Sequence, residues 1–168
     1  MDEQHACKIE LRSFTESDRE PVYEILTDNA IKQTYMIPDL SVPEGVEKLF
    51  QRLKEYSMAD NHFVRGIYAG KEFLGWINDV DISAGSMELG WVIRSKYHNR
   101  GYATEAVKLA IEALFAKGFS EIRAGAFEEN IASMCVIEKC GMQRIETVEE
   151  IEYRGKTHRC ICFAIKKG

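Results

Sequence analysis

The chain has 168 residues, of which 45% are hydrophobic and 29% are charged, and its formal net charge at pH 7 is −5. This length suits one domain with a substantial core rather than two domains, and the composition is that of a globular protein, not of a disordered or fibrous one. The negative charge argues against nucleic acids and anionic membranes as partners, because both call for a basic face.

The N-terminal end and the cysteines indicate the compartment. No apolar run approaches the ~18 residues that a membrane span needs, and residues 1–5 lack the charged-then-apolar order of a signal peptide. The cysteines form no Cys-x-x-Cys pair and no metal-ligand spacing with histidine; they are Cys7, Cys135, Cys140, Cys160 and Cys162. We therefore expect a cytoplasmic protein with reduced, buried thiols, no metal and no membrane partner.

The first third of the chain alternates strand and helix signals. Residues 9–13 alternate apolar and charged side chains, which predicts a half-buried strand, and an N-cap at 15–18 predicts a helix after it. Residues 29–40 show no clear period and predict a short helix or a loop. The capping box at Ser41-Val42-Pro43-Glu44 then predicts a second helix with an apolar stripe.

The middle of the chain reads as a run of strands. Residues 63–69 and 73–77 flank a turn at Gly70-Lys71 and predict a hairpin. After another turn at 83–86, residues 87–93 predict a strand that leads into a glycine-containing loop.

The last third returns to helices and strands. Apolar residues at helical spacing predict a helix over 103–114, which Gly118 ends with a left-handed cap. Residues 122–127 predict a strand parallel to the preceding one, because strand, helix and strand form a right-handed crossover. A helix over 130–140 and a hairpin over 142–165 complete the chain.

These elements predict one α/β (α+β) domain over residues 1–168. Its sheet is mixed and mostly antiparallel, with about seven strands and about four flanking helices. No repeat, low-complexity stretch or linker interrupts this order, and the oligomeric state stays open between monomer and homodimer.

The loop that opens the helix at 103–114 is the most informative stretch. A strand that turns on a glycine and enters a helix directs unpaired N–H groups and the positive helix end at one spot, which suits phosphate. Gly101 allows a close approach of backbone, and small Ala103 leaves the helix start unobstructed. A nucleotide P-loop would need Gly-Lys-Ser/Thr here, and the chain has Gly-Tyr-Ala-Thr. Alone, such a turn equally fits a purely steric need for glycine.

A second motif begins the helix at 130–140. Asn130 is an N-cap residue, and Ser133 follows one turn later on the same face. On physical grounds alone, this Asn-x-x-Ser is a capping pair.

Together the two motifs resemble the GNAT superfamily of acyl-CoA-dependent N-acetyltransferases, in particular its branch of ribosomal-protein alanine and serine N-terminal acetyltransferases. The superfamily's loop reads Gln/Arg-x-x-Gly-x-Gly/Ala, and this chain has His98-Asn99-Arg100-Gly101-Tyr102-Ala103. His98 departs from the usual first residue, which leaves the backbone cradle intact. The resemblance covers most of the chain in element order and implies a GNAT-like fold; its specific motifs span residues 87–141.

The resemblance implies acetyl-CoA as the co-substrate. The strand at 91–93 would pair with the pantetheine arm like an added strand, with the Trp91 N–H facing the thioester carbonyl. Ser133 would donate a proton to the departing thiolate, and Arg94 is a candidate phosphate partner beside Arg100. The cofactor-binding residues expected in this way are Trp91, Val92, Ile93, His98, Arg100, Gly101, Tyr102, Ala103, Thr104, Asn130 and Ser133.

Two carboxylates are candidate general bases. Glu88 matches a glutamate common in the superfamily, and Glu152 lies where the ribosomal-protein serine acetyltransferase carries its proposed base, eleven residues past Gly141. We expect Glu152 to be the base and Glu88 to contact an ordered water or the substrate, although either can be a plain surface charge. Tyr35, Trp76 and Trp91 are expected in the core.

The leading function is therefore acetyl transfer to a primary amine, with a peptide N-terminal α-amine favoured. Acetylation of a small amine such as a polyamine, an amino acid or an aminoglycoside is the rival reaction. A non-catalytic acyl-CoA-binding module is the rival of another class. The acceptor pocket is expected from the region around residues 29–40 and from the final hairpin.

Overall fold

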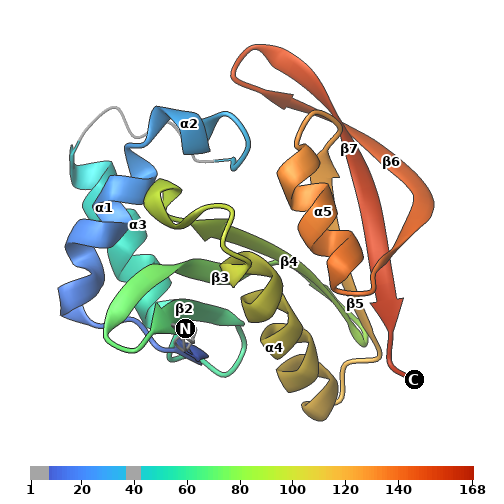
Figure 1. The fold of residues 1–168 in the computed structure, drawn as a ribbon, viewed down its shortest axis with the longest axis horizontal. Coiled ribbons are helices and arrows are strands. Elements are labelled where there is room, and N and C mark those ends of the chain that lie inside the picture. The colour runs from blue at the N-terminus through green and yellow to red at the C-terminus, as the bar shows by residue number, and fades with distance from the viewer. Residues whose placement is uncertain (1–7, 37–42) are drawn as a thin grey trace, which may run out of the picture.

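A computed structural model describes residues 8–36 and 43–168 of the chain (Figure 1). Ser41 and Val42 of the expected capping box, and Cys7, lie outside the described residues. The strands are β1 Ile9–Arg12, β2 Val64–Ala69, β3 Glu72–Ser83, β4 Ser86–Ile93, β5 Glu121–Phe127, β6 Gln143–Tyr153 and β7 Lys156–Lys166. The α-helices are α1 Arg19–Leu26, α2 Asn29–Lys32, α3 Pro43–Tyr56, α4 Tyr102–Ala116 and α5 Ile131–Lys139.

The seven strands form one sheet in the order β1-β2-β3-β4-β5-β7-β6. Only β4 and β5 pair in parallel, and the other neighbours are antiparallel, which confirms the predicted sheet. The described residues contain five α-helices where about four were expected. The additional one is the short α2, which forms because the Asp28 carboxylate accepts hydrogen bonds from the Ala30 and Ile31 N–H groups.

The sheet separates two hydrophobic clusters, and α4 and α5 cover one of its faces (Figure 1). Leu89 and Ile93 of β4 belong to the cluster under these helices, with Trp91 packed against it. Val92 belongs to the second cluster, which α1 and α3 cover. Because side chains alternate along a strand, Glu88 shares the α1/α3 face with Val92.

The parallel strands β4 and β5 part halfway along their length. Their pairing covers only Ser86 to Leu89 on β4 and Glu121 to Ala124 on β5. Beyond that point β4 continues alongside β3, and β5 continues alongside β7. A gap between two central strands therefore lies in the middle of the sheet.

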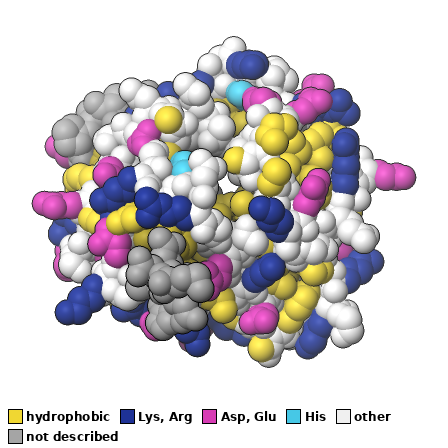
Figure 2. Space-filling model, viewed as in Figure 1, with side chains coloured by type: hydrophobic (Ala, Val, Ile, Leu, Met, Phe, Trp, Pro, Cys, Tyr) yellow, Lys and Arg dark blue, Asp and Glu magenta, His cyan; other side chains and the backbone are white. Residues whose placement is uncertain are grey.

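No described helix is both long and apolar enough to cross a membrane. In the view of Figure 2, lysine and arginine side chains are interspersed with acidic ones, and no patch of a single sign dominates the described surface there.

Candidate functional site

The start of α4 has the geometry of an anion site. Gly101 is its N-cap residue and has a φ of +79°, a left-handed conformation that a side chain rarely adopts. A Cβ at this position would meet no described atom within 4 Å. Gly101 also lacks a capping side chain, so no cap competes for the N–H groups of Tyr102, Ala103 and Thr104 in the first turn.

His98 and Arg100 flank this helix start. The His98 Nε2 donates a hydrogen bond to the Ile93 carbonyl at 2.6 Å, so the side chain ties the loop back to the end of β4. Arg100 is exposed, and its guanidinium lies 5.8 Å from the ring centroid of Tyr97. Arg100 is therefore available to an anion, whereas His98 has a role within the protein.

The ladder between β3 and β4 determines which backbone groups of β4 face the gap. The Arg94 N–H donates to the Leu74 carbonyl at 2.8 Å, which places Ile93 in a non-hydrogen-bonded pair with β3. Alternation then directs the N–H and C=O of Trp91 and Ile93 away from β3, toward the side from which β5 has parted. The Trp91 N–H therefore points away from β3, and its place opposite a thioester carbonyl stays a prediction.

Two expected cofactor contacts are corrected by the structure. The same alternation points the backbone groups of Val92 toward β3, and its side chain is buried. Arg94 is also buried, where it forms ion pairs with Glu24 and Glu72 and donates to the Phe73 carbonyl at 2.9 Å. Because these partners occupy the guanidinium, Arg94 stabilises the fold and is not free to bind phosphate.

The start of α5 carries both a cap and a free hydroxyl. The Asn130 Oδ1 accepts a hydrogen bond from the Ser133 N–H at 3.2 Å, which is the capping interaction expected on physical grounds. The Ser133 hydroxyl itself makes no hydrogen bond to another described residue. The cap therefore uses the backbone of Ser133 and leaves its side chain available.

A cavity of about 360 Å³, here called the central cavity, passes through the gap between β4 and β5. Its walls come from residues 34–36, from β3, β4 and β5, from the start of α5, and from β6 and β7. It brings together four of the predicted site residues, namely Glu88, Trp91, Asn130 and Ser133. Tyr35 and Trp91 line this cavity and are only half-buried, so they are not the core residues that were expected, whereas Trp76 is buried as expected.

The structure places the two glutamates that were predicted as candidate bases in different surroundings. Glu88 lines the central cavity, but Glu152 is exposed and is not among the residues that line it. Glu149 and Ile151 of the same strand do line the cavity, and alternation along β6 directs Glu152 to the opposite face of the hairpin. The carboxylate that β6 brings to the cavity is therefore Glu149, which the sequence analysis missed.

Glu88 lies in an environment that disfavours its ionised form. Burial raises the pKa of Glu88 above its ordinary 4.5, and the charges of Glu149 and Asp81 raise it further, against an opposing effect of Arg123. A Cβ on Gly125 would come within 3.8 Å of the Glu88 Oε1. A carboxyl group with a raised pKa in a partly closed cavity is a typical proton acceptor.

The thiols have no comparable role among the described residues. Cys140, Cys160 and Cys162 are buried and free, as expected, but Cys135 is exposed. Cys160 lines the central cavity, where burial and the neighbouring Cys162 raise its pKa to about 12, so it is a poor nucleophile. Within the described ranges, no three His, Cys, Asp or Glu side chains are arranged to hold a metal ion.

One side of the central cavity is closed by the β6–β7 hairpin. The Tyr153 hydroxyl donates to the Lys32 carbonyl at 2.6 Å and lies 3.2 Å from the Tyr35 carbonyl. His158 stacks on Phe127, a lining residue, with 4.2 Å between the ring centroids. The turn of the hairpin thereby reaches α2 (Figure 1), and residues far apart in sequence form one wall.

Comparisons with known sequences agree with this geometry. A sequence model of the family described as "Acetyltransferase (GNAT) domain" matches residues 8–143. YnaD of Bacillus subtilis (strain 168), an uncharacterized N-acetyltransferase, is 28% identical over 148 residues, which cover 80% of this chain and 78% of YnaD.

Solved structures of acetyltransferases share the fold, among them the following two. RimL, a ribosomal-protein α-N-acetyltransferase in complex with coenzyme A, superimposes with a TM-score of 0.83 at 16% identity over 95% of this chain and 94% of RimL. The spermidine N-acetyltransferase of Vibrio cholerae, in complex with CoA and spermine, gives a TM-score of 0.80 at 17% identity over 95% of each chain. At these identities the likeness concerns the fold alone.

Proposed function

The chain belongs to the acetyltransferase (GNAT) family, and on that premise we propose that it transfers the acetyl group of acetyl-CoA to a primary amine, with a protein N-terminal α-amine as the acceptor. One observation carries this proposal. The central cavity joins the two faces of the sheet where β4 and β5 part, with carboxylates toward one face and the start of α5 toward the other. An amine and a thioester that enter from opposite faces meet at this gap.

On the α4/α5 face, the chain offers backbone donors to acetyl-CoA. The N–H groups at the start of α4 suit its pyrophosphate, with exposed Arg100 as an added cation. The edge of β4 at Trp91 and Ile93 can pair with the amides of the pantetheine arm as a strand would. Because this recognition uses the backbone, it depends little on the side chains of the loop other than Gly101.

The attack requires stabilisation of charge on the thioester oxygen. The Trp91 N–H points into the gap and would donate to this oxygen as the amine nitrogen bonds to the carbonyl carbon. Glu149 would attract the cationic amine into the cavity, and Glu88 would take a proton from it, directly or through one water. Its raised pKa makes Glu88 a stronger base once it is ionised.

The last step is the departure of the thiol. When the carbon–sulfur bond breaks, the sulfur gains negative charge beside the start of α5. The Ser133 hydroxyl, which the helix cap does not use, would protonate this sulfur and recover its proton from solvent. In sum, the cationic amine loses two protons, one before the attack and one after it, which Glu88 would pass on to solvent. The sulfur gains one proton by way of Ser133, and the products are an amide, free CoA and one released proton.

A panel assay that follows the release of free CoA thiol tests this proposal. The acceptors are short peptides with Ala, Ser or Met at the N-terminus, polyamines, amino acids and aminoglycosides. We expect acetyl transfer to at least one peptide α-amine, in line with the branch to which RimL belongs. The reaction is proposed to take place in the cytoplasm, with the chain as a monomer or homodimer.

Two outcomes would overturn the proposal in different ways. Turnover confined to a small amine, as the spermidine acetyltransferase would suggest, keeps the chemistry and removes the peptide acceptor. Tight acetyl-CoA binding without turnover on the whole panel would favour a non-catalytic acyl-CoA-binding module.

A further inference from the structure

A second cavity of about 360 Å³, here called the flank cavity, lies between α1, α3 and the strands β2 and β3. It shares four lining residues with the central cavity, namely Tyr35, Met36, Asn78 and Val80. The two cavities therefore adjoin each other on the face that also carries Glu88. A volume of this size lies within the range of about 300–1,000 Å³ found for small-molecule sites.

The flank cavity offers a ligand mainly apolar surface. Its walls include Leu26, Leu49, Leu53, Tyr56, Val64 and Trp76.

The polar groups of the flank cavity are largely occupied. The His62 Nδ1 lies 3.1 Å from the Asp79 Oδ2, and the other oxygen of Asp79 accepts from the Phe63 N–H at 3.1 Å. Tyr56 stacks on His62 with 3.9 Å between the ring centroids. Among the described residues that line the flank cavity, Asp79 is the one carboxylate, and it is already hydrogen-bonded, whereas exposed Arg52 is a cation. A polyamine tail would therefore be poorly accommodated here.

The partition between the two cavities is held in place. The Tyr35 hydroxyl donates to the Asn78 Oδ1 at 2.7 Å and accepts from the Trp76 Nε1–H at 3.1 Å. The ring of Tyr35 also packs edge-on against Trp76, with 6.0 Å between the centroids. The boundary that the two cavities share is therefore preformed.

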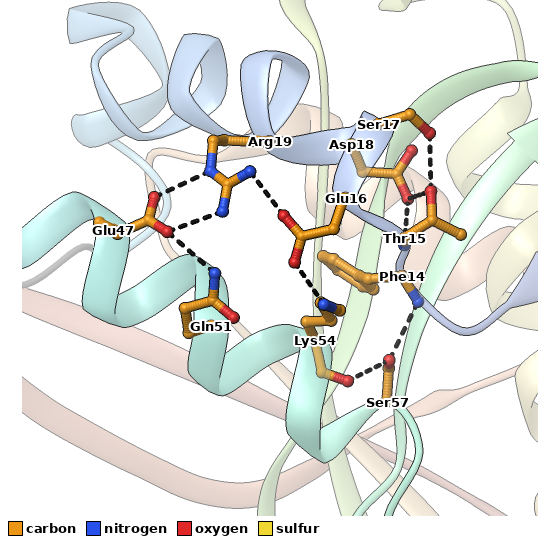
Figure 3. A network of polar contacts seen from close by, with 10 residues as sticks. All are labelled: Phe14, Thr15, Glu16, Ser17, Asp18, Arg19, Glu47, Gln51, Lys54 and Ser57. Carbon is orange, nitrogen blue, oxygen red and sulfur yellow. Dashed lines mark hydrogen bonds and ion pairs between the residues drawn. The ribbon is translucent and has the colours of Figure 1, made fainter.

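The helix on the other side of the flank cavity is also anchored. Figure 3 shows α3 tied to the start of α1 through Arg19, which donates two hydrogen bonds to Glu47 at 3.0 and 2.8 Å. Arg19 also bonds Glu16 at 2.6 Å, and Glu16 pairs with Lys54. The Arg19 guanidinium holds the pKa of Glu47 down at about 2, with further hydrogen bonds from Tyr23 and Gln51. These contacts fix the face of α3 that carries Leu49 and Leu53.

We propose that the flank cavity is the specificity pocket for the acceptor, and that it receives a bulky apolar or aromatic side chain attached close to the reacting amine. This inference rests on the proposed function and deepens it: the acceptor is a peptide whose first or second residue carries such a side chain. Glu88 and Glu149 attract the amine, and the apolar group extends past Tyr35, along the lining that the two cavities share, into the flank cavity. Apolar pockets discriminate by about 10- to 200-fold per methylene group.

The test compares acceptors and variants together. The acceptors are tetrapeptides that differ only at position one or two, with Phe, Leu, Ala or Ser, and spermidine is the polycationic control. Leu49→Trp fills the flank cavity from a half-buried position on α3. Glu55→Trp places the same side chain at an exposed position of that helix that lines neither cavity, so it controls for stability.

For the parent protein, we expect kcat/KM to be at least tenfold higher with Phe or Leu peptides than with Ser peptides or spermidine. Leu49→Trp should raise the acceptor KM of the Phe peptide at least tenfold, with the KM of acetyl-CoA and the rate on the Ala peptide little changed. Glu55→Trp should behave as the parent. Equal rates on Phe and Ser peptides, or an equal loss on all acceptors in Leu49→Trp, would overturn the inference while the proposed function stands.

If no acceptor turns over, the proposed acetyltransferase function is contradicted. A binding measurement then tests separately whether the flank cavity is a specificity pocket. Calorimetric titration of 2-phenylethylamine into the CoA-saturated parent and into CoA-saturated Leu49→Trp reports on the flank cavity through the difference between the two proteins. At least tenfold weaker binding to the variant supports the pocket. Equal binding to both proteins, or binding to neither, contradicts it.

Discussion

The two faces of the sheet are built for recognition in different ways. On the α4/α5 face, the candidate contacts are backbone groups at the start of α4 and along β4, supplied by consecutive residues. On the α1/α3 face, the candidate contacts are side chains from distant segments, with Glu88 from β4 and Glu149 from β6. A cofactor common to a family needs an unvarying backbone site, whereas acceptor choice can change through side chains without disturbing that site.

The largest effect is expected at Glu88, on the α1/α3 face, here called the acceptor face because the proposed acceptor binds there. Glu88→Gln removes the proposed base and should lower kcat by about 10²- to 10⁴-fold, the usual size of a general-base contribution. Glu149→Gln is the matched variant, since it removes a charge from the same cavity without removing the base. It should act mainly by raising the acceptor KM. Steady-state kinetics of both variants check this, and equal kcat values would show that neither carboxylate is the base.

The next effect is expected at the start of α5. Ser133→Ala should lower kcat by about ten- to a thousandfold while the affinity for acetyl-CoA changes little. The cap uses the Ser133 N–H, which alanine retains, so the melting temperature should stay close to that of the parent. Asn130→Ala removes the cap and should destabilise the protein by about 1 kcal/mol. A Ser133→Ala variant that loses stability and keeps full activity would contradict the proton-donor role.

A smaller effect is expected at the start of α4, on the α4/α5 face, here called the cofactor face because acetyl-CoA is proposed to bind there. Gly101→Val forces a branched side chain into a left-handed backbone, which costs about 1–3 kcal/mol, and should weaken acetyl-CoA binding by about 10- to 100-fold. Gly118→Val is the control, because Gly118 also has a positive φ, of +106°, and also has no described atom within 4 Å of a Cβ. Calorimetry should find normal affinity in Gly118→Val. A similar loss of affinity in both variants would point to general destabilisation.

The smallest effect concerns stability and pH. Because burial raises the pKa of Glu88, the folded chain binds this proton more tightly than the unfolded chain does. The free energy of unfolding therefore falls as the pH rises from about 4.5 through the folded pKa. Glutamine does not ionise, so Glu88→Gln should not show this fall in the free energy of unfolding. The melting temperature of the variant should therefore be a few degrees above that of the parent at neutral pH, and the difference should shrink below pH about 4.5. A lower melting temperature of the variant at pH 7 would contradict this sign.

The same contrast between the faces explains what the sequence could predict. The signals of the cofactor face are local: Gly101 at a strand-to-helix turn and Asn130 before a helix each identify their place from neighbouring residues. Arg94 could not be assigned in this way, because its partners Glu24 and Glu72 lie far along the chain.

The acceptor face depends on which way each strand turns its side chains. Counting residues from Gly141 selected Glu152, but β6 slips in register between Arg144 and Val148, so a count does not give the face. The sequence did contain a signal for the correct carboxylate. The apolar residues Ile151 and Tyr153 alternate with Glu152 and lie on the same face of the strand as Glu149, so Glu149 is the glutamate on the apolar face. The wall formed by residues 34–36 against the hairpin had no local pattern at all.

Amide hydrogen exchange with two ligands tests the central claim most directly, namely that cofactor and acceptor enter from opposite faces and meet between β4 and β5. The ligands are CoA and a conjugate in which CoA carries a peptide amine through an acetyl linker. We predict that CoA protects residues 91–93, 101–104 and 130–133, and that the conjugate adds protection at 34–36 and 149–151. Protection of residues 34–36 by CoA alone, or unchanged exchange at 91–104, would contradict this account.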